Sequence, residues 1–132
     1  MRDPRPGLTW SRGRVRRRAR YCAYMDSAAW RARRAAWYAE WLERHGRDPF
    51  CLVCGSTWTL RRGDLHHRCY DRLGDERFAD LLPLCRTDHA HLHQVWDASP
   101  AWRQLGRAAA SAGIIAALRR MRANPTTEGK CR

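Results

Sequence analysis

Cysteines and histidines with the spacing of metal ligands are concentrated between residues 51 and 93, and this pattern constrains the fold more than any other feature. In chain order they are Cys51, Cys54, His66, His67, Cys85, His89 and His93. The stretch is short for an independent hydrophobic core, so a bound metal ion would stabilise it. The sequence therefore predicts a small domain that is held together by metal.

The string Cys51-x-x-Cys54-Gly55 has the form of a zinc knuckle, in which both sulfurs face one ion and the glycine relieves the tight turn. Such a pair needs two more ligands, and Cys85 supplies one of them. Asp88 stands where a fourth cysteine would be expected, and a carboxylate oxygen is an acceptable zinc ligand. The alternative for Asp88 is that it caps a helix. We expect these three cysteines and Asp88 to hold a structural zinc ion.

His89 and His93 are separated by one helical turn, so their imidazoles can converge on one ion. His91 would point away from them by the same geometry. The third ligand must come from outside the helix, and His66 or His67 can supply it. Neighbouring residues on a strand face opposite ways, so only one of the two is expected to bind this ion. The other is left to act as a base, because an unligated imidazole titrates near neutrality.

The chain carries a large excess of positive charge. Its 132 residues include 26 basic and 13 acidic ones, for a formal net charge of +13, and every basic residue except Lys130 is arginine. Such a charge favours a polyanionic partner, most simply the phosphates of DNA. Residues 1–20 contain eight arginines and are expected to form a flexible basic arm. That arm either contacts DNA phosphates or is a solvated tail.

The sequence also bears on the location of the protein. It has no apolar run long enough to span a membrane, and its arginine-rich start lacks the apolar segment of a secretion signal. Six cysteines in a chain without such a signal favour reduced thiols and metal ligation over disulfides. We therefore expect a cytoplasmic protein with no membrane partner.

Periodicity and turn residues predict a mixed α and β fold. The expected elements are a helix from residue 26 or 27 to 45, a hairpin of strands 58–60 and 65–68 around a turn at 61–64, an apolar segment at 80–84, a helix from 87 or 88, and a last helix at 101–122. Trp30, Trp37 and Trp41 share one face of the first helix, which is typical of core packing. The last helix is expected to pack on the core or on a second copy of itself, which would make a homodimer.

Residues 51–93 resemble the HNH endonuclease family, whose ββα-metal motif (the treble-clef His-Me finger) is a hairpin and a helix around a metal ion. The strings that carry the resemblance are the knuckle, His66-His67-Arg68-x-Tyr70, Gly74-Asp75-Glu76, Asp80-Leu81-x-x-Leu84-Cys85 and His89-x-x-x-His93. They are similar to those of the phage-type subfamily with a zinc knuckle. The resemblance implies an α+β fold in which a small ββα-metal core is flanked by an N-terminal and a C-terminal helix.

The organisation that follows is a basic arm at 1–20, an HNH nuclease domain at 21–99 that includes the Trp-rich helix, a C-terminal helix at 100–124 and a polar tail at 125–132. The resemblance also implies roles for single residues. His66 would bind the catalytic ion with His89 and His93, and His67 would be the general base. Asp80 occupies the position of the family's central asparagine, which orients the base, and an acid there would raise the pKa of His67 by pairing with it.

The activity implied by the resemblance is metal-dependent hydrolysis of DNA phosphodiester bonds, with one divalent ion stabilising the transition state. Arg68 and Arg72 are candidates for contacts with the DNA backbone. The ion would be Mg²⁺, Mn²⁺, Ni²⁺ or Zn²⁺, and three imidazoles favour transition metals. Two alternatives stay open: a zinc-containing module that binds nucleic acid without cutting it, and an accessory nuclease of a phage DNA-packaging complex with a terminase-type partner. A phage-encoded protein would act in the cytoplasm of its bacterial host.

Overall fold

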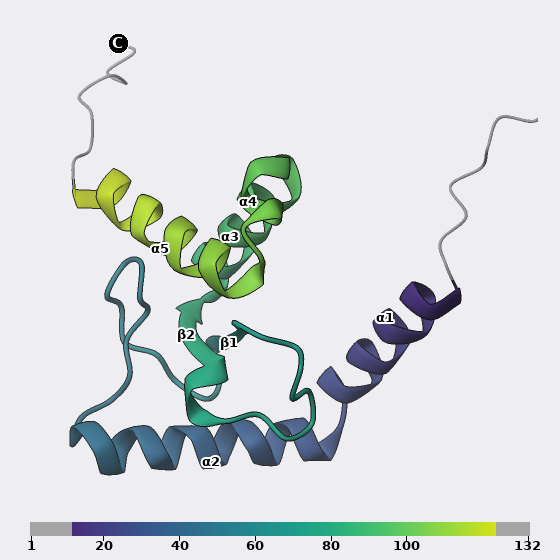
Figure 1. Ribbon diagram of the computed structural model, residues 1–132. Coiled ribbons are helices and arrows are strands. Elements are labelled where there is room, and N and C mark those ends of the chain that lie inside the picture. Colours follow the sequence, from purple (N-terminus) through teal and green to yellow (C-terminus); the bar gives the residue numbers. More distant parts are fainter. Residues whose placement is uncertain (1–11, 124–132) are drawn as a thin grey trace, which may run out of the picture.

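The computed structural model describes residues 12–123, which form a mixed α and β fold (Figure 1). The elements are α1 (Arg12–Met25), α2 (Ala28–His45), β1 (Gly63–His67), the 3-10 helix η1 (Phe78–Asp80), β2 (Leu81–Cys85), α3 (Arg86–Ala98), α4 (Pro100–Gln104) and α5 (Arg107–Ala123). The expected α+β class is confirmed by the five α-helices and the two-stranded antiparallel sheet in this part of the chain. None of its helices combines the length and the apolar character needed to cross a membrane.

Helix α2 forms where its sequence predicts it. The hydroxyl of Ser27 accepts a hydrogen bond from the backbone N–H of Trp30, and Gly46 ends the helix in the left-handed conformation with φ 66°. Trp30, Trp37 and Trp41 are buried, as their helical spacing indicates. The tryptophan face therefore belongs to the core.

The two strands that pair are not the two that the sequence suggested. β1 pairs with β2 in a register that places Leu65 opposite Pro83, so the expected pairing of 58–60 with 65–68 is wrong. Trp58 is instead buried under β1, and its indole N–H donates to the carbonyl of Asp64 at 2.8 Å. Gly63 makes this approach feasible, because a Cβ at that position would overlap the indole ring.

The hairpin separates two hydrophobic clusters, with α2 on one side and α3 and α5 on the other (Figure 1). The cluster on the α2 side contains Trp30, Trp37, Trp41, Trp58, Leu65 and Leu81. The cluster on the α3 and α5 side contains Cys51, Val53, Leu84, Leu92, Ile114, Ile115 and Leu118. Because α5 contributes to the second cluster, it is an integral part of the core and not an appended helix.

Both ends of the described region differ from expectation. Residues 12–20 of the expected flexible arm lie in α1, whereas 1–11 and the expected polar tail at 125–132 lie outside the described residues. The expected single helix at 101–122 is interrupted, because Gly106 takes the left-handed conformation with φ 81° between α4 and α5. Leu105, at this interruption, is 59% exposed.

Candidate metal centres and active site

The knuckle turn and the start of α3 bring three thiols and one carboxylate together. The ligand atoms of Cys51, Cys54, Cys85 and Asp88 lie within 4.8 Å of one another, and we call this group the knuckle centre. Cys54 Sγ lies 3.9 Å from Cys85 Sγ, and Asp88 Oδ2 lies 3.3 Å from Cys51 Sγ and 3.2 Å from Cys85 Sγ. A tetrahedral zinc ion with Zn–S bonds of about 2.3 Å would hold two sulfurs about 3.8 Å apart. The spacing of these donors therefore fits a tetrahedral ion.

Asp88 does not cap helix α3. The cap is Cys85, whose sulfur accepts a hydrogen bond from the backbone N–H of Asp88. The Asp88 side chain is fully buried, with Oδ2 toward the sulfurs and Oδ1 accepting a hydrogen bond from Arg122 of α5 at 2.6 Å. Asp88 therefore stands as a fourth possible ligand beside the three sulfurs and not as the cap of the helix.

The knuckle centre places an ionised carboxylate among thiols whose pKa values are shifted by burial. Burial raises the pKa of the Cys51 thiol and raises that of the Cys85 thiol to about 12. Burial also acts to raise the pKa of Asp88, but hydrogen bonds from the neighbouring thiols hold it below its ordinary value. A divalent ion would deprotonate such thiols outright. These four residues could therefore hold a metal ion, and their donor set is one that zinc accepts.

Three imidazoles form a second candidate centre. His66 from β1 meets His89 and His93 from α3, and we call this group the histidine centre. The Nε2 atoms of His89 and His93 are 3.1 Å apart, and their ring centroids lie 5.4 Å and 5.5 Å from that of His66. The expectation that these three histidines lie together agrees with the structure. His91 is exposed, as its position between the two ligands indicates.

Neighbouring polar groups leave one nitrogen of His66 and one nitrogen of His89 available in the histidine centre. His66 Nε2 is 2.8 Å from Ser111 Oγ, and its Nδ1 is buried without a hydrogen-bond partner among residues 12–123. His89 Nδ1 is 3.0 Å from Asp64 Oδ2, so its Nε2 faces His93. Metal-bound histidines commonly donate the other ring N–H to such partners. Burial, with help from Arg107, lowers the pKa of His66 to about 2, so this ring is neutral, as ligation requires.

His67 lies on the opposite face of β1, away from the histidine centre. Its ring centroid is 4.9 Å from that of Trp30, and its Nε2 is 3.0 Å from Glu76 Oε1, with both side chains almost completely buried. Burial lowers the pKa of His67, and Glu76 only partly opposes this effect. Adjacent histidines thus occupy two chemically different environments, as the alternation of a strand requires.

Glu76 is held in place from several directions. Its Oε2 accepts a hydrogen bond from Tyr24 at 2.8 Å, and its Oε1 accepts one from the backbone N–H of Gly74 at 3.3 Å. Burial acts to raise the pKa of Glu76, but hydrogen bonds, the largest of them to His67, hold it below its ordinary value. The carboxylate is therefore ionised beside a neutral imidazole.

The expectation that Asp80 pairs with His67 and raises its pKa is wrong. Asp80 instead accepts hydrogen bonds on both carboxylate oxygens from Arg72, with Nε at 2.7 Å, and a further one from the backbone N–H of Arg77. The hydrogen bond to Arg72 lowers the pKa of Asp80 to about 2. Arg72, expected to contact DNA, thus helps to fix the loop before β2. Arg68, the other such candidate, is exposed.

Several residues that shape the site were not singled out from the sequence as site residues. Asp64 and Ser111 contact His89 and His66 of the histidine centre, Glu76 contacts His67, and Arg122 contacts Asp88. Of these residues, only Glu76 lies in one of the strings that carry the family resemblance, Gly74-Asp75-Glu76. Comparisons of the chain with models of protein families, with curated proteins and with solved structures found no match. The chemistry of the site therefore follows from its own residues.

Proposed function

We propose that the chain is a metal-dependent endonuclease of the HNH type that hydrolyses phosphodiester bonds of DNA. The observation that carries the proposal is that His66 and His67 occupy two different environments. His66 joins two further imidazoles in a candidate metal centre. His67 is paired with a buried carboxylate on the opposite face of the strand. The succession of β1, β2 and α3 around these groups supports a ββα-metal core.

The two candidate centres take different parts in this proposal. The knuckle centre holds a structural zinc ion and joins the knuckle turn to α3. The histidine centre holds the catalytic ion, which is Mg²⁺, Mn²⁺, Ni²⁺ or Zn²⁺, and its three imidazoles favour a transition metal. When bound there, the ion supplies charge neutralisation at the scissile phosphate and at the departing 3′ oxygen.

His67 is the general base of the proposed reaction. Glu76 engages Nε2, so Nδ1 is the nitrogen that takes a proton from the attacking water. The carboxylate fixes the tautomer of the ring and stabilises the imidazolium that forms. Arg107 of α5 donates a hydrogen bond to the carbonyl of His67 at 2.7 Å, which holds the backbone of the base in place.

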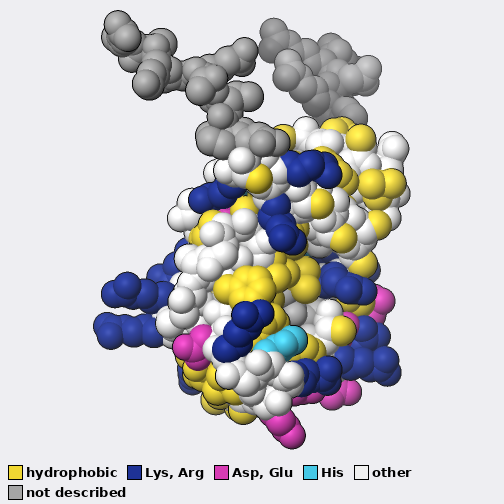
Figure 2. Space-filling model, turned by 90° about the vertical axis from the view of Figure 1, so that its left-hand side faces the viewer, with side chains coloured by type: hydrophobic (Ala, Val, Ile, Leu, Met, Phe, Trp, Pro, Cys, Tyr) yellow, Lys and Arg dark blue, Asp and Glu magenta, His cyan; other side chains and the backbone are white. Residues whose placement is uncertain are grey.

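The charge of the protein supports DNA as the substrate. Arginine side chains lie across the face seen in Figure 2 and project from its edges. Arg68 is exposed directly after the strand that carries both histidines. A net charge of +13 favours phosphate contacts and gives no base specificity. The charge therefore supports binding to the phosphate backbone of DNA.

Plasmid cleavage tests the activity directly. Supercoiled plasmid is incubated with wild type, His67→Ala and His91→Ala in Mg²⁺, Mn²⁺, Ni²⁺ or Zn²⁺, with a chelator control. We expect wild type and His91→Ala to relax or linearise the plasmid, because His91 is exposed and outside the histidine centre. His67→Ala should be slower by about 10²–10⁴-fold, the usual contribution of a general base. The proposal fails if wild type leaves the plasmid intact in every metal, and DNA binding without cleavage would favour the non-cleaving module.

Metal analysis tests the structural ion separately. The purified protein should contain about one tightly held zinc ion per chain, because such ions are part of the folding free energy of small metal-built domains. Cys51→Ser should lose this zinc and unfold the core. Cys22→Ser is the matched control, because Cys22 is exposed on α1. A folded, zinc-free wild-type protein would contradict the assignment.

A further inference from the structure

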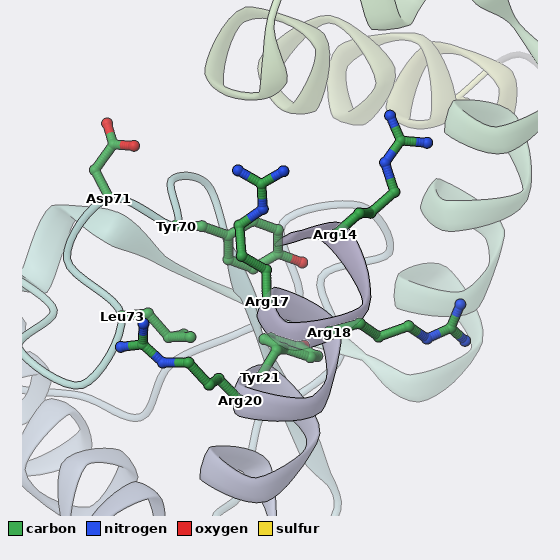
Figure 3. A pocket seen from close by; sticks show the side chains of 8 residues that line it. All are labelled: Arg14, Arg17, Arg18, Arg20, Tyr21, Tyr70, Asp71 and Leu73. Carbon is green, nitrogen blue, oxygen red and sulfur yellow. The ribbon is translucent and has the colours of Figure 1, made fainter. Parts of the chain in front are cut away.

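A cavity of about 530 Å³ lies between α1 and the loop that follows β1 (Figure 3). Four arginines of α1 line it, Arg14, Arg17, Arg18 and Arg20, together with aromatic side chains from both segments. Its volume is within the range of about 300–1,000 Å³ that small-ligand sites occupy. None of the interactions assigned to the proposed reaction uses this cavity.

The aromatic part of the cavity adjoins the proposed general base. Tyr21 and Tyr70 meet edge to face with ring centroids 5.3 Å apart, and these centroids lie 6.0 Å and 5.7 Å from that of His67. The guanidinium carbon of Arg107 stands 3.9 Å from the centroid of the Tyr70 ring. Tyr70 is 40% exposed, so part of its ring remains open to a ligand. A molecule in this cavity would therefore lie close to His67, the proposed general base.

Helix α1 is suited to binding a polyanion, and its charge makes it unstable in isolation. It has six arginines, no acidic residue and no buried residue. Arginines at i and i+4, such as Arg14 and Arg18 or Arg16 and Arg20, repel each other. Asp71 is the single acidic residue in the lining of the cavity, so the lining is strongly positive. Phosphates between these arginines would relieve the repulsion and release counterions.

We propose that this cavity binds an unpaired nucleotide of a DNA single strand, with its base stacked on Tyr70 and its flanking phosphates held by Arg17 and Arg18. The inference rests on the proposed function, because it places this nucleotide next to the phosphate that His67 acts on. Aromatic rings combined with a basic groove are the usual way of holding single strands. Bases in a duplex are stacked on one another, so their faces cannot reach Tyr70. The preferred substrate is therefore single-stranded or locally unpaired DNA.

Binding is measured apart from cleavage to test this inference. The full-length His67→Ala protein is titrated into a fluorescent single strand and into the same strand annealed to its complement, and anisotropy is recorded. We expect the single strand to bind about tenfold more tightly, and Tyr70→Leu in this background to abolish that preference while Tyr70→Phe keeps it. Equal affinity for strand and duplex, or an unchanged preference in Tyr70→Leu, overturns the inference.

A charge-matched pair of variants tests the arginines. Arg17→Gln with Arg18→Gln should lower the slope of log affinity against log salt for the single strand by about 1.4, because each lost phosphate contact contributes about 0.7. Arg119→Gln with Arg120→Gln removes the same charge from exposed positions of α5 and should leave the slope unchanged. Equal slope changes in both pairs would overturn the inference. A protein that binds single strands in this way and never cuts them would refute the proposed function and leave the binding of single strands intact.

Discussion

The contact between His67 and Glu76 allows the most direct test of the proposed active site. Glu76→Gln keeps the shape of the side chain, and its amide oxygen can still accept hydrogen bonds from His67 and Gly74, while Tyr24 can accept from the new amide N–H. The substitution therefore removes a charge without creating a cavity. We expect the fold to persist and the stabilisation of the imidazolium to be lost.

Two estimates give lower and upper limits for the loss in cleavage rate. A hydrogen bond to an ionised partner is worth about 1 kcal/mol more than one between neutral groups, which is roughly fivefold in rate. Two charges about 4 Å apart at an effective dielectric constant of about 20 attract each other by about 4 kcal/mol, which is roughly 10³-fold. Because the side chains of His67 and Glu76 are 1% and 0% exposed, we expect kcat to fall toward the upper value.

Single-turnover cleavage with saturating metal measures this effect, and thermal unfolding monitors the fold. Glu43→Gln is the matched control, because Glu43 is exposed on α2 and lies outside the site. Asp80→Asn is the informative comparison, since Asp80 contacts Arg72 and not His67. The reasoning is refuted if Glu76→Gln cuts at the wild-type rate, or if Asp80→Asn lowers kcat by as much as Glu76→Gln does.

The remaining predictions concern the supports of the fold and of the knuckle centre. Arg122→Gln should weaken zinc binding about tenfold in a chelator competition. Losing a partner of a metal ligand costs roughly 10–100-fold in affinity, and the low end applies because Arg122 is half exposed. An equal loss in Arg120→Gln would contradict the role of the contact between Arg122 and Asp88. Gly63→Ala should destabilise the protein by about 1–3 kcal/mol in denaturant unfolding, because the new methyl group overlaps the indole of Trp58. An unchanged unfolding midpoint would show that the segments around Gly63 and Trp58 can move apart at no cost.

Elements with a strong local signal could be predicted from the sequence. The Ser27 cap, the tryptophan spacing and Gly46 all act within one helix, and the structure places α2 accordingly. The alternation of a strand likewise indicated that His66 and His67 face opposite ways, and they do. Metal-ligand spacing is also local, since His89 and His93 lie one turn apart. These predictions succeeded because each depended on residues close together in the chain.

Contacts between distant segments could not be predicted in the same way. The turn at 61–64 suggested a hairpin, but burial of Trp58 beneath β1 left that strand to pair with β2. The choice between Asp80 and Glu76 as the partner of His67 depended on how the loop between β1 and β2 closes. In the structure the closed loop pairs Asp80 with Arg72 and places Glu76 against Tyr24 and His67. No periodicity in the sequence encodes such a closure.

Helix α5 links the two candidate centres, so an ion bound in one of them would affect the other. Arg107 donates to the carbonyl of His67, Ser111 hydrogen-bonds His66, and Arg122 contacts the carboxylate ligand of the knuckle centre. At 100° per residue, these three positions lie within about 60° of one another around the helix, so one face makes all three contacts. An ion in the knuckle centre would hold the end of α5 that carries Arg122 in place. The same helix positions Ser111 against His66, so an ion bound in the knuckle centre would stabilise the geometry of the histidine centre.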